Sequence, residues 1–221
     1  MNTLLLQRFS FKNPLEIVED AKKREVLPLS GKTTIRADRE SLSNDLAVLL
    51  ATAKLAEQDP LLVHFPFEQD RSPETDKWMP VFINLCRPVQ SAWIWKTMRT
   101  YVPEEYTEKI ERLREQWDGY YATAHADGET KAELLPKWDF LTTAAILYEN
   151  PVNDVNFSIS SRMAQEEWDA YIDEIKKLSR MEPDPKLYVL LPNATEVPFT
   201  VSISSHSDAR HYVIRLLDGV S

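Results

Sequence analysis

Glycine and cysteine are scarce in this sequence, with four and one respectively among 221 residues. So few glycines exclude architectures that depend on many glycine turns, and they leave almost none for a loop that cradles a phosphate group. The single cysteine, Cys86, provides neither a disulfide framework nor a zinc cluster. Because this cysteine usage is typical of a reducing compartment, we expect the protein to be cytoplasmic.

The sequence also lacks an excess of basic residues and a long apolar run. Its formal net charge is −9 at pH 7, which argues against direct binding of nucleic acid, because phosphate contacts need clustered Lys and Arg. The least polar window, 78–102, is interrupted by two prolines and three basic residues, so we expect no membrane span. Residues 1–11 have no basic start and no small-residue cleavage site, so we expect no signal peptide.

The composition and the apolar periodicity are those of a globular protein. Hydrophobic residues make up 43% of the chain, a typical value, and we expect one domain over 1–221. The cleanest helical period lies at 103–125, where apolar residues recur at steps of three and four. Pro103 suits the first helical position, and Glu104 and Glu105 suit the positive end of the helix dipole. We therefore expect the fold to be organised around a long amphipathic helix at about 103–125.

The patterns along the chain predict an α+β fold, with a helical part at about 13–182 and a β part at about 3–11 and 187–217. Alternation at 5–11 predicts a first strand, and Pro14 predicts the start of a short helix that ends at residue 24. A short strand is expected at 29–37, and then a helix at about 39–58 that Asp38 caps. A surface loop is expected at 59–77, where prolines and charges gather.

Further helices are predicted at 88–102, 138–149 and 162–180, whereas the window 80–87 is too short and too apolar to assign. Beyond them, the segments 187–191, 197–204 and 211–217 have β character and predict a three-stranded meander. The N-terminal strand is expected to join this antiparallel sheet, since chain ends often lie close together. The side chains of the helix at 162–180 that are expected to face inward are Trp168, Tyr171, Ile172, Ile175 and Leu178.

An aromatic and basic group stands out on the helix predicted at 88–102. Apolar side chains cover much of this helix, which indicates either burial on several sides or a surface that contacts a partner. Such a group can stack on the bases of single-stranded nucleic acid, but in an acidic protein the core or a protein interface is favoured. The candidate protein-binding residues are Trp93, Trp95, Arg99 and Tyr101.

Residue types that bind metal ions gather near the last predicted turn, at His206, Asp208 and His211. In a hairpin these three side chains could converge on a divalent metal ion. A solvated turn has the same composition, and catalytic metal sites usually draw a ligand from elsewhere in the chain. The turn is the favoured interpretation, and the metal site is kept as an alternative.

Three other groups have ordinary structural interpretations beside the chemical ones. Cys86 next to Arg87 suggests an activated nucleophile, but its apolar neighbours favour a core residue. Residues 30–33 match the end of a phosphate-binding loop, but the earlier glycine that the motif requires is Val26. The acidic run at 166–174 is typical of a solvated helix face.

The sequence therefore favours a non-enzymatic cytoplasmic subunit or adaptor that binds other macromolecules through aromatic and acidic surfaces. No convincing catalytic set is present, and Trp and Tyr are residue types that concentrate at interface hot spots. We expect a protein partner and no cofactor. The first alternative is a metal-dependent hydrolase that uses His206, Asp208 and His211. The second alternative is an acidic mimic of nucleic acid that inhibits a nucleic-acid enzyme.

Overall fold

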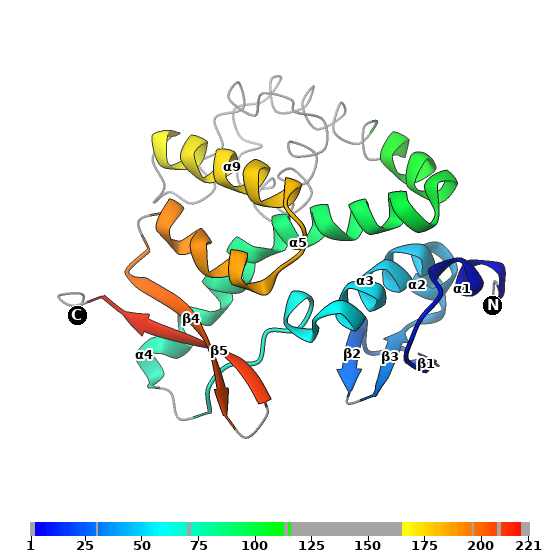
Figure 1. The fold of residues 1–221 in the computed structure, drawn as a ribbon, viewed down its shortest axis with the longest axis horizontal. Helices are drawn as coiled ribbons and strands as arrows, with labels where there is room; N and C mark the ends of the chain where they lie inside the picture. Colours follow the sequence, from blue (N-terminus) through cyan, green and yellow to red (C-terminus); the bar gives the residue numbers. More distant parts are fainter. Residues whose placement is uncertain are drawn as a thin grey trace.

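A long central helix organises the fold. The computed structural model describes residues 3–29, 31–69, 72–112, 115, 165–195, 197–206 and 209–217. Helix α5 (Met79–Tyr101) crosses the molecule, and a three-stranded sheet and a two-stranded hairpin lie beside its two halves (Figure 1). The predicted α+β class is confirmed, but α5 takes the central place that was expected for 103–125.

Helical structure continues beyond α5 at 103–112. The predicted helix that begins at Pro103 is therefore confirmed for its first part. The segment 116–164, which includes the helix predicted at 138–149, lies outside the described residues. No helix in the described part of the chain is long and apolar enough to cross a membrane.

The N-terminal part contains a mixed sheet of three strands. Gly31, with a φ of 74°, lies in the turn between the second and third strands, a backbone conformation that suits a residue without a Cβ atom. The first strand runs parallel to the third and the second runs antiparallel to it, in the order β1-β3-β2. The strands are β1 (Leu15–Glu19), β2 (Glu25–Leu29) and β3 (Lys32–Ala37).

Helix α3 (Leu46–Gln58) packs against β2 and β3, and helices α1 (Thr3–Phe9) and α2 (Arg39–Asn44) pack against α3. The predicted helix at 39–58 is confirmed, with a break at Asp45 that separates α2 from α3. Its predicted cap is confirmed as well. The Asp38 carboxylate accepts a hydrogen bond from the Ser41 backbone N–H at 2.8 Å, which satisfies one of the free donors of the first turn.

Two N-terminal predictions are wrong. The segment predicted as a strand at 5–11 is helical as far as Phe9, where α1 ends. Leu5 and Phe9 are four residues apart, and both are buried on one helical face. The segment predicted as a helix from Pro14 forms β1 instead. Ile17 and Val18 are β-branched and favour extended backbone, and all five residues of β1 pair with β3.

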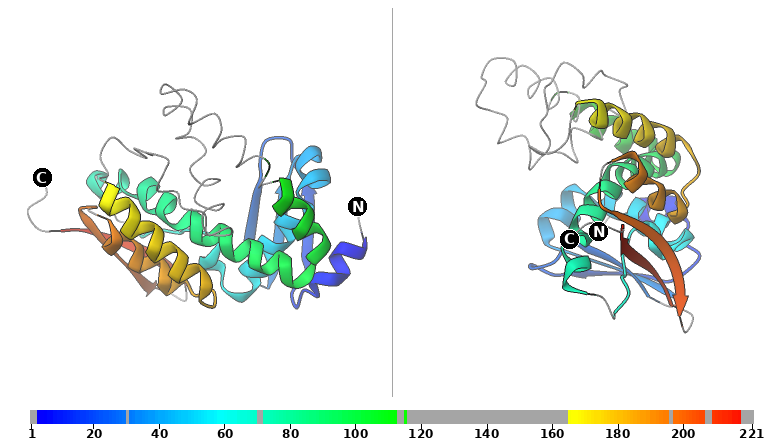
Figure 2. Two further views of the ribbon diagram at one scale, coloured as in Figure 1. Left: turned by 90° about the horizontal axis from the view of Figure 1, so that it is seen from above. Right: turned by 90° about the vertical axis from the view of Figure 1, so that its left-hand side faces the viewer.

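The C-terminal part surrounds the N-terminal half of α5. Helix α9 lies alongside α5 in both Figure 1 and Figure 2, and the hairpin lies on the other side of the short helix η4. The described part of the predicted loop at 59–77 contains a 3-10 turn and a short helix. The elements of this part are η1 (Pro60–Leu62), α4 (Pro73–Asp76), α9 (Gln165–Arg180), η4 (Pro185–Ala194), β4 (Phe199–His206) and β5 (Ala209–Leu216).

The C-terminal sheet has two strands, so the prediction of a three-stranded meander is wrong. Strand β4 pairs antiparallel with β5 along its full length, and this hairpin is separate from the β1–β3 sheet. The segment at 187–191 lies in η4 instead. Tyr188 and Leu191 are three residues apart and both fully buried, which suits the period of a 3-10 helix. Asp184 caps η4 and so favours the helix over a strand.

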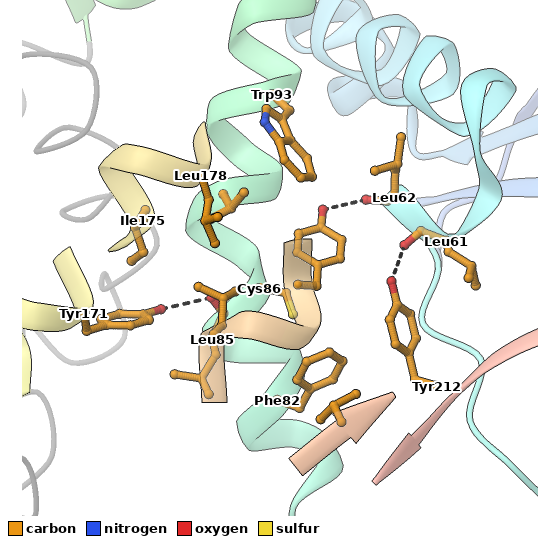
Figure 3. Packing of buried hydrophobic residues seen from close by; sticks show 14 of the residues in the cluster. Leu61, Leu62, Phe82, Leu85, Cys86, Trp93, Tyr171, Ile175, Leu178 and Tyr212 are labelled. Atoms are coloured by element: carbon orange, nitrogen blue, oxygen red, sulfur yellow. Dashed lines mark hydrogen bonds between the residues drawn. The ribbon is translucent and has the colours of Figure 1, made fainter. Parts of the chain in front are cut away.

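Two clusters of buried side chains meet along α5. The first packs the N-terminal half of α5 against α9, η4 and the hairpin (Figure 3). The second packs α1, β3 and α3 against the end of α5, at Met98 and Val102. Ile94 packs against both clusters. Helix α5 is therefore a wall that the two clusters share.

Three tyrosine hydroxyls in the first cluster donate hydrogen bonds to backbone carbonyls, as Figure 3 shows. A buried hydroxyl without a partner is costly, so these bonds favour one arrangement of α9, η4 and β5 around α5 and η1. The three bonds are Tyr171 to the Leu85 carbonyl at 3.0 Å, Tyr188 to the Leu62 carbonyl at 2.9 Å and Tyr212 to the Leu61 carbonyl at 2.9 Å.

Candidate binding groove

An open groove of about 610 Å³ lies where α1, β1, α2, the start of α3 and the helix at 103–112 come together. We call it the α2 groove. Half of its lining side chains are apolar and half are polar or charged. The lining residues are Leu5, Ile17, Glu19, Arg39, Leu42, Ser43, Asn44, Leu46, Ala47 and Glu105.

The apolar part of the α2 groove is the outer edge of the second buried cluster. Leu5, Leu46 and Ala47 are buried members of that cluster, and Ile17 and Leu42 are partly buried against it. The groove is thus lined by side chains that the core already holds in place. Its apolar surface is aliphatic, whereas the sequence predicts an aromatic one.

Ion pairs hold the walls of the α2 groove together. The Asp45 carboxylate, at the corner between α2 and α3, pairs with Arg24 at 3.0 Å and with Lys109 at 2.9 Å. Lys109 lies on the helix at 103–112, so this pair connects that helix to the corner. Arg8 of α1 pairs with Glu104, the neighbour of the lining residue Glu105, at 2.7 Å. The groove is therefore preformed within the described part of the chain.

The pKa of Glu104 reflects its position. The backbone N–H of its own residue and then the Arg8 guanidinium hold the pKa of this carboxyl below its usual range, because both stabilise the charged form. The carboxylate therefore stays ionised, and paired with Arg8, down to a lower pH than an unpaired glutamate would.

Three charged side chains of the α2 groove have no such partner. Within the described residues, Glu19, Arg39 and Glu105 make no side-chain hydrogen bond and no ion pair. Arg39 is the first residue of α2, where the positive end of the helix dipole disfavours a cation. Glu19 and Arg39 therefore add nothing evident to the stability of the fold, and Glu105 adds only its favourable place in the first turn of the helix at 103–112.

A second open cleft, of about 580 Å³, lies between the end of α3 and the connection from α9 to η4. Its charged side chains are mostly used within the fold. Arg210 pairs with Asp59 at 2.6 Å, Glu182 pairs with Lys96 at 3.0 Å, and Asp184 caps η4. This contrast makes the α2 groove the stronger candidate for a binding site.

The structure does not place the four candidate residues of the 88–102 helix on one exposed surface. Trp93 is fully buried in the first cluster and contacts Tyr188 at a ring distance of 5.2 Å, so it cannot contact a partner. Trp95 and Tyr101 are partly buried against the second cluster, and Arg99 is exposed. The prediction of a joint aromatic surface needs this correction, because α5 has buried clusters on more than one side.

The candidate metal ligands lie in the hairpin. His206 and His211 are on the same face of the β4 and β5 pair, the face opposite to the buried one, and they occupy diagonal positions. Asp208 lies outside the described residues. The described part of the chain contains no group of three residues that could hold a metal ion.

The remaining candidates have structural roles where the structure describes them. Cys86 is fully buried, and burial raises the pKa of its thiol well above the usual value, which disfavours the nucleophilic thiolate. Lys32 pairs with Glu16 at 2.7 Å and Thr33 is buried in β3, so this segment is a turn and a strand rather than a phosphate-binding loop. Of the acidic run at 166–174, the side chains before 170 lie outside the described residues.

Sequence reasoning missed the α2 groove. Its free charges come from three elements far apart in the chain, and no local motif joins them. One signal was present, because Arg39 follows the cap residue Asp38 directly, at a position where acidic residues are usual.

Comparison with protein-family models gives no match, and searches of curated proteins and of solved structures find no significant match either.

Proposed function

We propose that this protein is a non-enzymatic adaptor and that it binds a segment of another protein in the α2 groove. One observation carries the proposal: an aliphatic surface bordered by three charged side chains that have no partner within the described part of the chain. Apolar contacts supply most of the free energy of association, and unpaired charges at the border supply specificity.

The position of the charges supports a binding role. A stable fold gains little from unpaired charges on an apolar groove, and here the neighbouring charges are paired across the walls. An open groove with a charged border suits an extended or helical segment, which covers a long surface. Small-molecule sites usually enclose most of their ligand. The acidic surfaces expected from the sequence are kept in this proposal, and the aromatic ones are replaced by aliphatic ones.

The experiment compares two tryptophan variants of the full chain. Ser43→Trp places a large side chain at an exposed position of the α2 groove, where Trp and Ser have similar helix propensities. The control variant, Ser202→Trp, places the same large side chain at an exposed position of β4, far from the groove in the fold. Circular dichroism and urea unfolding establish that both variants fold.

Each variant and the unmodified protein are then used to capture proteins from an extract of the source cells, and the captured proteins are quantified. We expect at least one protein that the unmodified chain and Ser202→Trp retain equally and that Ser43→Trp loses by about tenfold or more. Equal retention of every captured protein by Ser43→Trp contradicts the proposal.

A further inference from the structure

We infer that the α2 groove selects a basic amphipathic segment, which places apolar side chains on the aliphatic lining and a Lys or Arg toward Glu19 and Glu105. This inference rests on the proposed function and adds the chemistry of the bound segment to it.

Charge complementarity is the first argument. The groove presents two carboxylates and one guanidinium that lack partners within the described residues, so its border is negative overall. Glu105 is partly buried, and a partly buried carboxylate is screened less by water and salt than an exposed one. A cation on the bound segment is therefore attracted most strongly by Glu105. Glu19 adds a second, weaker attraction.

Arg39 adds hydrogen-bond donors to the lining of the groove. Its guanidinium offers several N–H donors in a fixed plane, which suit backbone carbonyls or a carboxylate of the bound segment.

The same charges argue against other occupants. A second copy of this chain carries a net charge of −9, so it is repelled by a border that is already negative. Nucleic acid is opposed in the same way, because its phosphates would approach two unpaired carboxylates. A basic segment is the occupant that the border favours.

The probe is a library of random twelve-residue peptides displayed on phage and selected on the full chain at about 0.15 M salt, where charges are screened beyond roughly 8 Å. A parallel selection on Ser43→Trp removes sequences that bind elsewhere. We expect the peptides that need an open groove to combine Lys or Arg with neighbouring Leu, Ile, Val or Met.

The dissociation constant of a selected peptide is then measured on two double variants with equal charge change. Glu19→Gln/Glu105→Gln removes the carboxylates of the groove. Glu68→Gln/Glu182→Gln removes two exposed carboxylates elsewhere. Ion pairs near a protein surface contribute modestly to affinity, so the loss of two of them predicts an affinity about twofold to thirtyfold weaker for the first variant. The control variant should lose less than about twofold.

The outcomes separate the two proposals. Peptides that depend on the groove but lack basic residues, or an unchanged affinity in Glu19→Gln/Glu105→Gln, overturn this inference and leave the adaptor function standing. Selection of the same peptides on Ser43→Trp overturns the groove as the binding site. A dimer in light scattering that Ser43→Trp abolishes makes a second copy the occupant and overturns the inference as well.

Discussion

The substitution Lys54→Met tests how strongly a buried ion pair stabilises the N-terminal part. Lys54 and Glu57 lie one turn apart on α3 with side chains only 8% and 5% exposed, and their charged atoms are 2.6 Å apart. The Lys54 ammonium also donates to the Ser10 carbonyl at 3.0 Å and lies over the rings of Phe11 and Tyr101. It therefore connects α3 to the chain between α1 and β1.

Removing the cation leaves the Glu57 charge buried. Breaking a buried pair from one side costs about 3–5 kcal/mol, but Glu57 keeps hydrogen bonds from the backbone N–H groups of Lys12 and Asn13, at 2.5 and 2.8 Å. We therefore expect Lys54→Met to lower the free energy of unfolding by about 2–4 kcal/mol in urea titrations. For a chain of this size the melting temperature should fall by about 10 °C.

The matched control is Lys177→Met. Lys177 pairs with Glu174 at the same spacing on α9, but its side chain is 65% exposed, so its loss should change the free energy of unfolding by less than about 0.5 kcal/mol. Equal costs for Lys54→Met and Lys177→Met would refute the argument, because only the Lys54 pair is buried and has the added contacts with Ser10, Phe11 and Tyr101.

The pair also predicts a pH dependence. Burial raises the pKa of Glu57, but the hydrogen bond from Lys54 and those from the two backbone N–H groups outweigh it and leave the pKa below its ordinary value of 4.5. A carboxyl with a lowered pKa stabilises the folded state fully above the unfolded value, and this contribution disappears as pH falls through the folded value. In urea titrations between pH 6 and pH 3, the unmodified protein should lose more stability than Glu57→Gln.

Three further predictions concern single side chains. Asp38→Ala should cost about 1 kcal/mol of unfolding free energy because it removes the cap of α2, whereas Asp38→Asn, which can still cap, should cost less; urea titration measures both. Tyr212→Phe should lower the free energy of unfolding by about 1–1.5 kcal/mol, because it leaves the Leu61 carbonyl without a donor among the described residues. Tyr188→Phe should lower it less, because Gln90 still donates to the Leu62 carbonyl. An equal cost for the two tyrosine variants would contradict this reasoning. Cys86 should resist a thiol reagent in the folded protein and react fully in 6 M guanidinium chloride, since burial keeps the thiol protonated and inaccessible; rapid labelling of the folded protein would show that the site opens.

Local signals were sufficient for some elements and insufficient for others. The helix at 39–58 could be predicted because its cap and its apolar period are both contained in neighbouring residues. The inward positions Tyr171, Ile172, Ile175 and Leu178 of α9 were predicted for the same reason, and all four are buried.

Ambiguous spacing explains the errors. Leu5, Phe9 and Phe11 fit a strand when every second residue is counted and a helix when Leu5 is paired with Phe9. Pro88 suggests a boundary at the middle of α5, because proline in a helix interior costs about 3 kcal/mol. The helix continues through Pro88, since tertiary burial on several sides outweighs that cost.

The candidate site could not be predicted because it depends on tertiary structure. Glu19, Arg39 and Glu105 come together only when β1, α2 and the helix at 103–112 pack around the second cluster. The unpaired state of these charges is equally invisible in the sequence, which contains many acidic and basic residues at similar spacings.

The shared wall formed by α5 has a consequence for dividing the chain. A break in the loop between η1 and α4 would leave the first fragment without Met98 and Val102, and the second fragment without Leu55, Leu61 and Leu62. Each fragment would then expose one side of an incomplete core. Neither should fold when produced alone, and the two should regain structure when they are produced together.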